Sequence, residues 1–149
     1  MQPGAWDTHG FLLQGASLAD VVASDAAKLA ALGVTAAQVG QDLALVLESG
    51  ATSDWLRPFK AGPYSVEILR RRGFITCPWA TEEYQACAAG HPFAATANQF
   101  RIVRRLSRQS LEGFVLSSHL IQLHGFFGGP GSRFRIEPEQ AVAVLGLHR

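Results

Sequence analysis

The sequence predicts an α+β protein in which an N-terminal helical hairpin precedes a small, mostly antiparallel sheet with short helices. Apolar residues recur at the helical spacing of three and four up to residue 49, and from residue 64 onward they alternate as in a strand. The charge also changes, because residues 1–62 hold three Lys and Arg against six Asp and Glu, whereas residues 63–149 hold ten Arg against six Glu. We therefore expect a helical hairpin with a linker at 1–62 and an α+β module at 63–149.

The composition fits one folded domain without the signature of a polyelectrolyte or a membrane protein. The chain has 149 residues, of which 48% are hydrophobic and 17% charged, so it can bury a core. Its formal net charge of +1 gives no global attraction to nucleic acid or to an anionic membrane. No apolar run approaches the roughly 18 residues of a membrane span, and the first sixteen residues lack the basic start of a secretory signal. We expect a cytoplasmic protein without membrane contact.

The N-terminal part carries the local signals of two helices joined by a short turn. Ser17 precedes the first apolar stripe as an N-cap, and Gly33 follows it where a left-handed residue ends a helix. Thr35 and Gln38 form the capping-box pattern of a second helix, which ends near Ser49. Because the connection is so short, we expect the two helices to pack antiparallel.

The C-terminal part follows a linker predicted at residues 50–63, where Gly, Pro, Ser and Asp break both periods. Alternation at residues 64–68 predicts a strand, and residues 74–76 predict a short second one. Residues 81–89 predict one or two helical turns. A β-hairpin is expected over residues 98–115, its inner face formed by Phe100, Ile102 and Leu106.

Three further elements complete the predicted module. A short helix is expected between Ser117 as its N-cap and Gly125 as its C-cap. Residues 134–136 predict a last strand. Pro138 and Gly146 mark the start and the end of a final helix.

The residues that best suggest chemistry are the cysteines and histidines of this module. Cys77 and Cys87 precede the pair His119 and His124, which stands as H-x4-H on the expected short helix. Zinc prefers thiolate and imidazole donors in a tetrahedron, and a His pair of this spacing on a helix is typical of structural Cys2His2 sites. We therefore predict that zinc staples the module through these four residues, with His91 as a competing ligand.

The spacing of the two histidines determines the directions in which their side chains point from a helix. Residues five apart differ by about 140° around an ideal helix, so a regular helix points them apart. Gly125 directly follows the second histidine, and we expect a loosened last turn to bring that imidazole back toward the metal. Nine residues separate the two cysteines, against roughly two to four in a zinc finger. Only the set of ligands is similar to that of a zinc finger, and the sequence indicates no protein family.

Other interpretations of these residues stay open. The cysteines are compatible with a disulfide, which the missing secretory signal disfavours, or with two unrelated buried thiols. A catalytic zinc needs an open position and a nearby acid, and Glu82 and Glu83 are the acids closest in sequence to a ligand. We favour a small binding protein with structural zinc. The alternatives are a metal-dependent hydrolase that uses His119 and His124, and a metal-free dimeric interaction protein.

Arginines form a second candidate site. Arg101 and Arg105 lie on the expected hairpin, where they are suited to contacting phosphates. Arg133 and Arg135 flank a glycine-rich loop whose backbone N–H groups could form an anion nest. These four are candidate nucleic-acid or anion ligands, although the net charge of +1 weighs against nucleic acid.

The two N-terminal helices also predict self-association. They carry more apolar residues than one stripe can hold, so an apolar face would remain outside; the residues concerned are Leu18, Val22, Leu29, Leu45 and Val46. Monomers rarely expose such a face, and pairing about a two-fold axis would bury it. We therefore predict a homodimer with Leu45 at the subunit contact.

Overall fold

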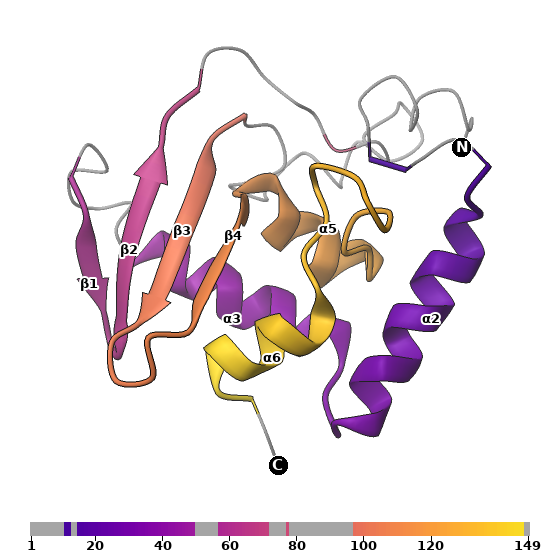
Figure 1. Ribbon diagram of the computed structural model, residues 1–149, viewed down its shortest axis with the longest axis horizontal. Coiled ribbons are helices and arrows are strands. Elements are labelled where there is room, and N and C mark those ends of the chain that lie inside the picture. The colour runs from indigo at the N-terminus through magenta and orange to yellow at the C-terminus, as the bar shows by residue number, and fades with distance from the viewer. Residues whose placement is uncertain (1–10, 13–14, 50–56, 72–76, 78–96, 148–149) are drawn as a thin grey trace.

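A computed structural model describes residues 11–12, 15–49, 57–71, 77 and 97–147. In this part of the chain two helices come first, a four-stranded sheet follows and two shorter helices end the fold (Figure 1). The helices are α2 (Leu18–Ala31), α3 (Ala36–Glu48), α5 (Leu116–His124) and α6 (Pro138–Leu145), and the strands are β1 (Phe59–Ala61), β2 (Tyr64–Leu69), β3 (Gln99–Arg104) and β4 (Ser110–Phe114). This arrangement confirms the predicted α+β class.

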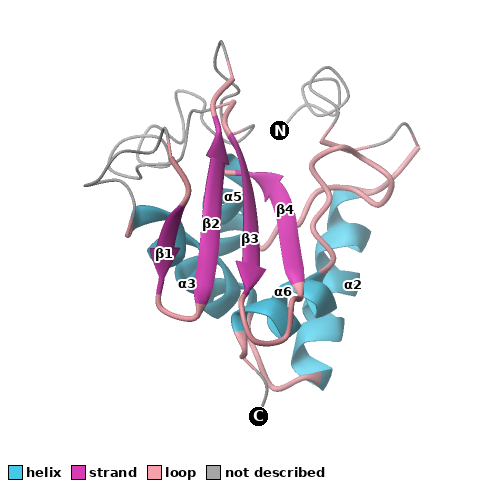
Figure 2. Ribbon diagram, turned by 60° about the vertical axis from the view of Figure 1, so that its left-hand side comes forward, coloured by secondary structure: helices cyan, strands magenta, loops and turns pink. Residues whose placement is uncertain are grey.

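The strands form one antiparallel sheet in the order β1-β2-β3-β4. Alternate residues of a strand point to opposite faces. Helices cover the inner face, and in the described chain no helix lies over the outer face (Figure 2). The inner face carries a buried cross-strand row, Val66, Ile102 and Leu111, and the outer face carries a charged row, Glu67, Arg101 and Glu112.

Local capping signals act as predicted in the first two helices. The Ser17 hydroxyl accepts a hydrogen bond from the Asp20 N–H, and both hydrogen bonds of the Thr35–Gln38 capping box are present. Gly33 has a φ of +75°, the left-handed conformation that the residue after a helix end needs. The helix orientation differs from the prediction, since the directions of α2 and α3 diverge by 85° and the helices do not run antiparallel.

The packing of α3 explains this difference. Gly40 of α3 lies so close to Gln122 of α5 that a Cβ at Gly40 would overlap the Gln122 backbone. Leu43 and Leu47, which form the apolar stripe of α3, belong to the same buried cluster as the inner residues of the sheet. Because the sheet and α5 bury that stripe, α2 turns away and packs beside α6 instead.

Several local predictions are corrected by the structure. Residues 59–61 form β1 inside the predicted linker, because β2 supplies their pairing partner. Residues 134–136 form no strand but a buried loop, in which the Ile136 N–H bonds to the Phe127 carbonyl. The N-cap of α5 is not Ser117, since the helix already begins at Leu116.

The second half otherwise follows its local signals. The hairpin predicted at 98–115 is formed by β3 and β4, although its alternation ends at the turn, where Leu106 is 94% exposed. Helix α6 begins at Pro138, and Gly146 ends it with a φ of +66°. The strand predicted at 74–76 and the helical turns predicted at 81–89 lie outside the described residues.

The hydrophobic core draws on both sides of residue 62. One buried cluster combines Leu29 of α2 and Leu43 of α3 with Val66 of β2 and Ile102 of β3. A second cluster joins residues near the N-terminus to residues of the second half and consists of Phe11, Leu12, Cys77, Phe114, Leu116, Leu120, Phe126 and Phe134. None of the described helices is by itself long and apolar enough to cross a membrane; α2 and α3 meet the length and composition only as a pair bent by 85°.

Candidate metal centre

Helix α5 presents two histidines, and its ending fixes the second one. The helix ends at His124, and Gly125 takes a left-handed φ of +63°. The N–H groups of Gly125 and Phe126 bond to the carbonyls of Ile121 and Leu120, which completes the last turn. The last turn therefore keeps its helical hydrogen bonds and is not loosened as predicted, and Phe126 is buried directly after it.

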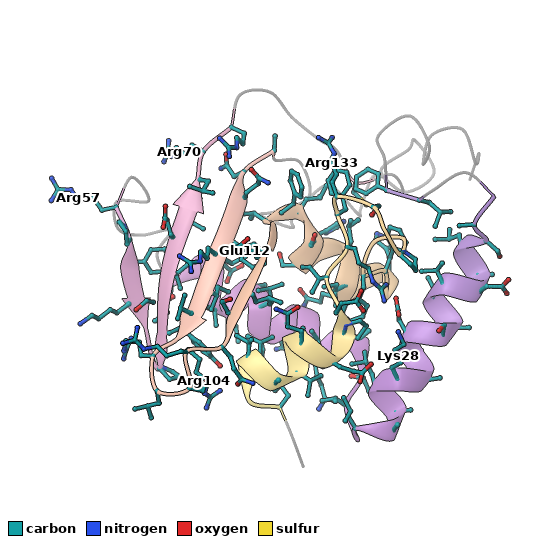
Figure 3. The ribbon with its side chains drawn as sticks, viewed as in Figure 1. Lys28, Arg57, Arg70, Arg104, Glu112 and Arg133 are labelled. Atoms are coloured by element: carbon teal, nitrogen blue, oxygen red, sulfur yellow. The ribbon has the colours of Figure 1, made fainter. Side chains whose placement is uncertain are left out.

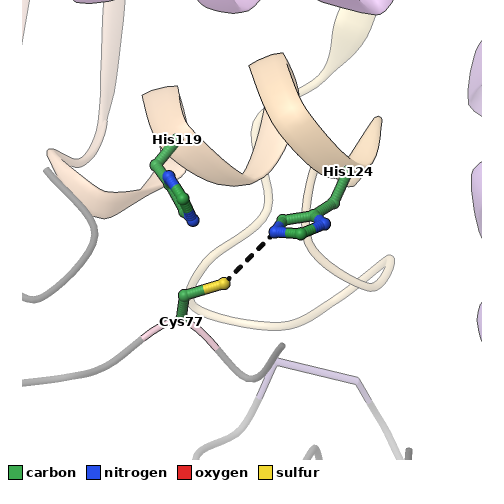
Figure 4. A group of neighbouring side chains, drawn as sticks. All are labelled: Cys77, His119 and His124. Carbon is green, nitrogen blue, oxygen red and sulfur yellow. Dashed lines mark hydrogen bonds between the residues drawn. The ribbon is translucent and has the colours of Figure 1, made fainter. Parts of the chain in front are cut away.

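Cys77 meets these histidines from a distant part of the chain. One ligand atom from each of Cys77, His119 and His124 lies within 4.8 Å of the other two. The Cys77 Sγ lies 3.4 Å from the Nε2 of His124, and the two imidazole centroids are 5.3 Å apart. Figure 4 shows the sulfur between the two rings, on the side of α5 to which both point. The structure thus brings three of the predicted ligands together.

These distances suit a tetrahedral zinc ion. With Zn–S of about 2.3 Å and Zn–N of about 2.0–2.1 Å, tetrahedral angles place a sulfur and a nitrogen about 3.6 Å apart. The distance of 3.4 Å between Cys77 Sγ and His124 Nε2 matches one such edge. The widest separation between two of the three ligand atoms is at most 4.8 Å. It reaches the distance in a tetrahedral site if one ligand atom moves toward the centre by roughly 1 Å, and rotation of an imidazole about its side-chain torsions supplies such a movement.

The donors lie at the edge of an apolar cluster. Cys77 is 2% exposed, His119 is fully buried and His124 is partly exposed. Cys77 packs within the second cluster, together with Leu116 and Phe126 from the ends of α5. Apolar surroundings restrict the access of water to a metal, which is typical of a closed site. Within the described residues, no carboxylate belongs to the donor group.

The other residues predicted for this chemistry lie outside the described part of the chain. They are the proposed ligand Cys87, its competitor His91, and the acids Glu82 and Glu83. The identity of a fourth ligand, and the disulfide alternative between the two cysteines, therefore stay predictions.

Arg135, one of the predicted anion ligands, forms a buried ion pair with Asp25. Its guanidinium donates two hydrogen bonds to the Asp25 carboxylate, at 2.6 and 2.9 Å, and two more to Glu137. Burial acts to lower the pKa of Arg135, but the hydrogen bonds to Asp25 and Glu137 outweigh burial and raise it. The same contact lowers the pKa of Glu137, mainly through its hydrogen bond to Arg135. Arg135 therefore joins α2 to the loop before α6.

Asp25 is a structural residue that the sequence analysis missed. It is 2% exposed, although it is charged. The sequence contained a signal for this role, because Asp25 lies on the apolar stripe of the helix between Val22 and Leu29. A buried carboxylate at such a position needs a positively charged or hydrogen-bonding partner.

The other three candidate anion ligands contact different parts of the fold. Arg101 pairs with Glu112 on the outer face of the sheet at 3.2 Å. Arg105 donates to backbone carbonyls at the β1–β2 turn. Arg133 lies over the rings of Phe114 and Phe134. The four arginines thus lie at separate places in the fold, where each contributes to local packing or pairing, and their role as nucleic-acid or anion ligands stays a prediction.

Comparison of the chain with protein-family models, with curated proteins and with solved structures finds no match. Cys77, His119 and His124 form the cluster of metal-binding side chains among the described residues.

Proposed function

We propose that this chain is a small cytoplasmic binding protein in which Cys77, His119 and His124 hold a structural zinc ion. The observation that carries the proposal is the convergence of three donor atoms within 4.8 Å. Cys77 and His124 are 47 positions apart in the sequence, so their contact depends on the tertiary fold and not on local spacing. A zinc ion there would tie the chain at Cys77 to α5 and add to the free energy of unfolding.

A structural role for the metal is favoured over a catalytic one by its surroundings. The Cys77 thiol and the His119 imidazole are buried, as the ligands of closed structural zinc sites are, and such sites use four protein ligands. We propose Cys87 as the fourth ligand and His91 as its competitor, on the sequence spacing alone.

Zinc content and thermal stability test this proposal together. The purified full chain should carry close to one equivalent of zinc by elemental analysis, and a chelator should lower its melting temperature. Cys77→Ser and His119→Gln should lose the metal. Ser118→Ala is the matched control, because it removes a buried hydrogen bond of 2.9 Å to Val115 in the same helix without removing a donor. Retention of zinc by both donor variants would contradict the proposal.

A metal-dependent hydrolase is the second candidate, because the described residues supply three protein donors, the number that catalytic zinc sites use. Cys87→Ser separates the two candidates. A structural centre should bind zinc less tightly after this substitution. A catalytic centre should keep its zinc and hydrolyse an activated ester, such as p-nitrophenyl acetate, faster than the metal-free chain.

A further inference from the structure

Strand β2 has an edge that its neighbour does not cover. Pairing with β1 ends at Phe59 and Val66, whereas β2 continues to Leu69. Pro58 precedes β1 and has no N–H with which to extend the ladder. The uncovered stretch therefore comprises the last residues of β2.

The alternation of an antiparallel ladder shows which backbone groups are exposed there. The Arg105 N–H bonds to the Pro63 carbonyl, so the odd-numbered residues of β2 direct their backbone groups toward β3. The even-numbered residues direct theirs toward β1. The N–H and C=O of Ile68 thus face the uncovered edge, and among the described residues none is paired with it on that side.

A basic hollow lies beside this edge. Its volume is about 280 Å³, and its lining residues are Arg57, Pro58, Glu67, Ile68, Leu69, Arg70 and Arg71. The three arginines are exposed, and Glu67 is the one acidic residue among these lining residues. Figure 3 shows Arg57 before the start of β1 and Arg70 beyond the end of β2, on the two sides of the uncovered stretch. In the described chain no ion pair engages either of them.

We propose that this edge binds an extended acidic peptide of a partner protein as an added strand. The peptide backbone would form hydrogen bonds with the N–H and C=O of Ile68. Acidic side chains of the peptide would form salt bridges with Arg57 and Arg70, because a planar guanidinium can donate two parallel hydrogen bonds to a carboxylate. Leu69, which is 38% exposed, offers an apolar contact to a side chain between two acids.

A peptide fits this site better than a nucleic acid does. The open edge offers a backbone donor and acceptor, which a peptide strand satisfies and a phosphate backbone does not. Single-stranded nucleic acids also stack their bases on exposed aromatic rings. Among the described residues, the aromatic residue that lines the hollows of this face is Phe100, which is 1% exposed.

The inference rests on the binding role proposed above but not on the zinc ion. The probe is a fluorescein-labelled peptide of eight residues in which Glu and Val alternate, titrated into the full chain at low salt and followed by anisotropy. Zinc content is measured on the same samples, so a failure of the metal centre and a failure of peptide binding are seen separately.

Charge reversal tests the arginines. Arg70→Glu should weaken binding by at least about tenfold, the equivalent of one charge-assisted pair. Arg108→Glu is the matched control, since it makes the same charge change at an exposed position of the β3–β4 turn and should change the affinity by less than twofold. Equal losses in both variants would overturn the proposal, as would the absence of peptide binding.

Backbone methylation tests the added strand. Methyl groups on the Glu nitrogens and on the Val nitrogens block opposite edges of the peptide, so one of the two methylated peptides should lose binding. Binding of both at the affinity of the unmodified peptide would overturn strand addition. Binding of a single-stranded oligonucleotide in place of the peptide would overturn the proposal in favour of a nucleic-acid surface.

Discussion

Replacement of Asp25 by Ala should destabilise the fold more than any other single loss of charge in the described chain. The Asp25 and Arg135 side chains are 3% and 8% exposed, so the substitution leaves a guanidinium buried without its main partner. Breaking a buried ion pair costs about 3–5 kcal/mol. Arg135 keeps its contact with the half-exposed Glu137, so we expect the lower end of that range, about 3 kcal/mol.

Urea unfolding measures this effect, and a thermal melt should show a fall of roughly 6–12 °C for a chain of this length. Lys28→Ala is the matched control, because Lys28 lies 4.0 Å from the same carboxylate but is 40% exposed. That substitution should cost less than about 1 kcal/mol. A double variant, Asp25→Leu with Arg135→Met, removes both charges and should recover most of the stability.

Two results would refute this reasoning. If Asp25→Ala costs no more than Lys28→Ala, the pair between α2 and the loop before α6 does not form in solution. If the double variant is as unstable as Asp25→Ala, the loss comes from packing around α2 and not from an uncompensated charge.

Three further predictions follow from other parts of the fold. Gly40→Ala should lower the free energy of unfolding by about 1–3 kcal/mol in urea, because its Cβ meets the Gln122 backbone; an unchanged value would contradict the close packing of α3 on α5. Leu45 is 56% exposed, so if the chain forms the predicted homodimer, Leu45→Glu should reduce its mass in light scattering to 16.0 kDa, and a wild-type mass of 16.0 kDa would exclude the dimer. Arg135 lowers the pKa of Glu137, so this pair stabilises the fold above the ordinary carboxyl pKa of 4.5 and the contribution is lost as the pH falls through the lowered value. Glu137→Gln should therefore show a shallower loss of stability in acid, and identical pH profiles would contradict the ion pair.

Helix ends and the inward-facing residues of a strand depend on residues that are close in sequence, so the sequence predicted them. Ser17, the Thr35–Gln38 box and Gly146 act within one turn of a helix, so their pattern predicted the helix ends correctly. The alternation at Tyr64, Val66 and Ile68 likewise predicted the inner face of β2.

Features that depend on residues distant in sequence were not predicted correctly. The 85° angle between α2 and α3 follows from the contact of Gly40 with Gln122, and a local pattern contains no information on that partner. Strand β1 is three residues long and exists because β2 pairs with it. The loop at 134–136 alternates like a strand in sequence, yet Arg135 is held in a buried ion pair with Asp25 of α2.

At the candidate metal centre, the sequence predicted the ligand residues but not how the fold brings them together. Residue types and the H-x4-H spacing predicted Cys77, His119 and His124, which converge in the structure. The sequence predicted that a loosened last turn at Gly125 would bring the rings together, but that turn keeps its helical hydrogen bond from Gly125 to Ile121. Both rings point to the side of α5 on which the Cys77 sulfur lies, and a local pattern contains no information on that distant residue.

X-ray absorption at the zinc edge of the purified full chain tests the metal centre most directly, because it reports the ligand atoms themselves. Zinc–nitrogen distances of about 2.0–2.1 Å and zinc–sulfur distances of about 2.3 Å are expected, from two imidazoles and two thiolates if Cys87 completes the site, or from three imidazoles and one thiolate if His91 does. Cys77→Ser should lose the zinc and with it the absorption edge, and Ser118→Ala should leave the spectrum unchanged. A chain that holds no zinc after purification and zinc addition, or one whose zinc has only oxygen neighbours, would contradict the central claim.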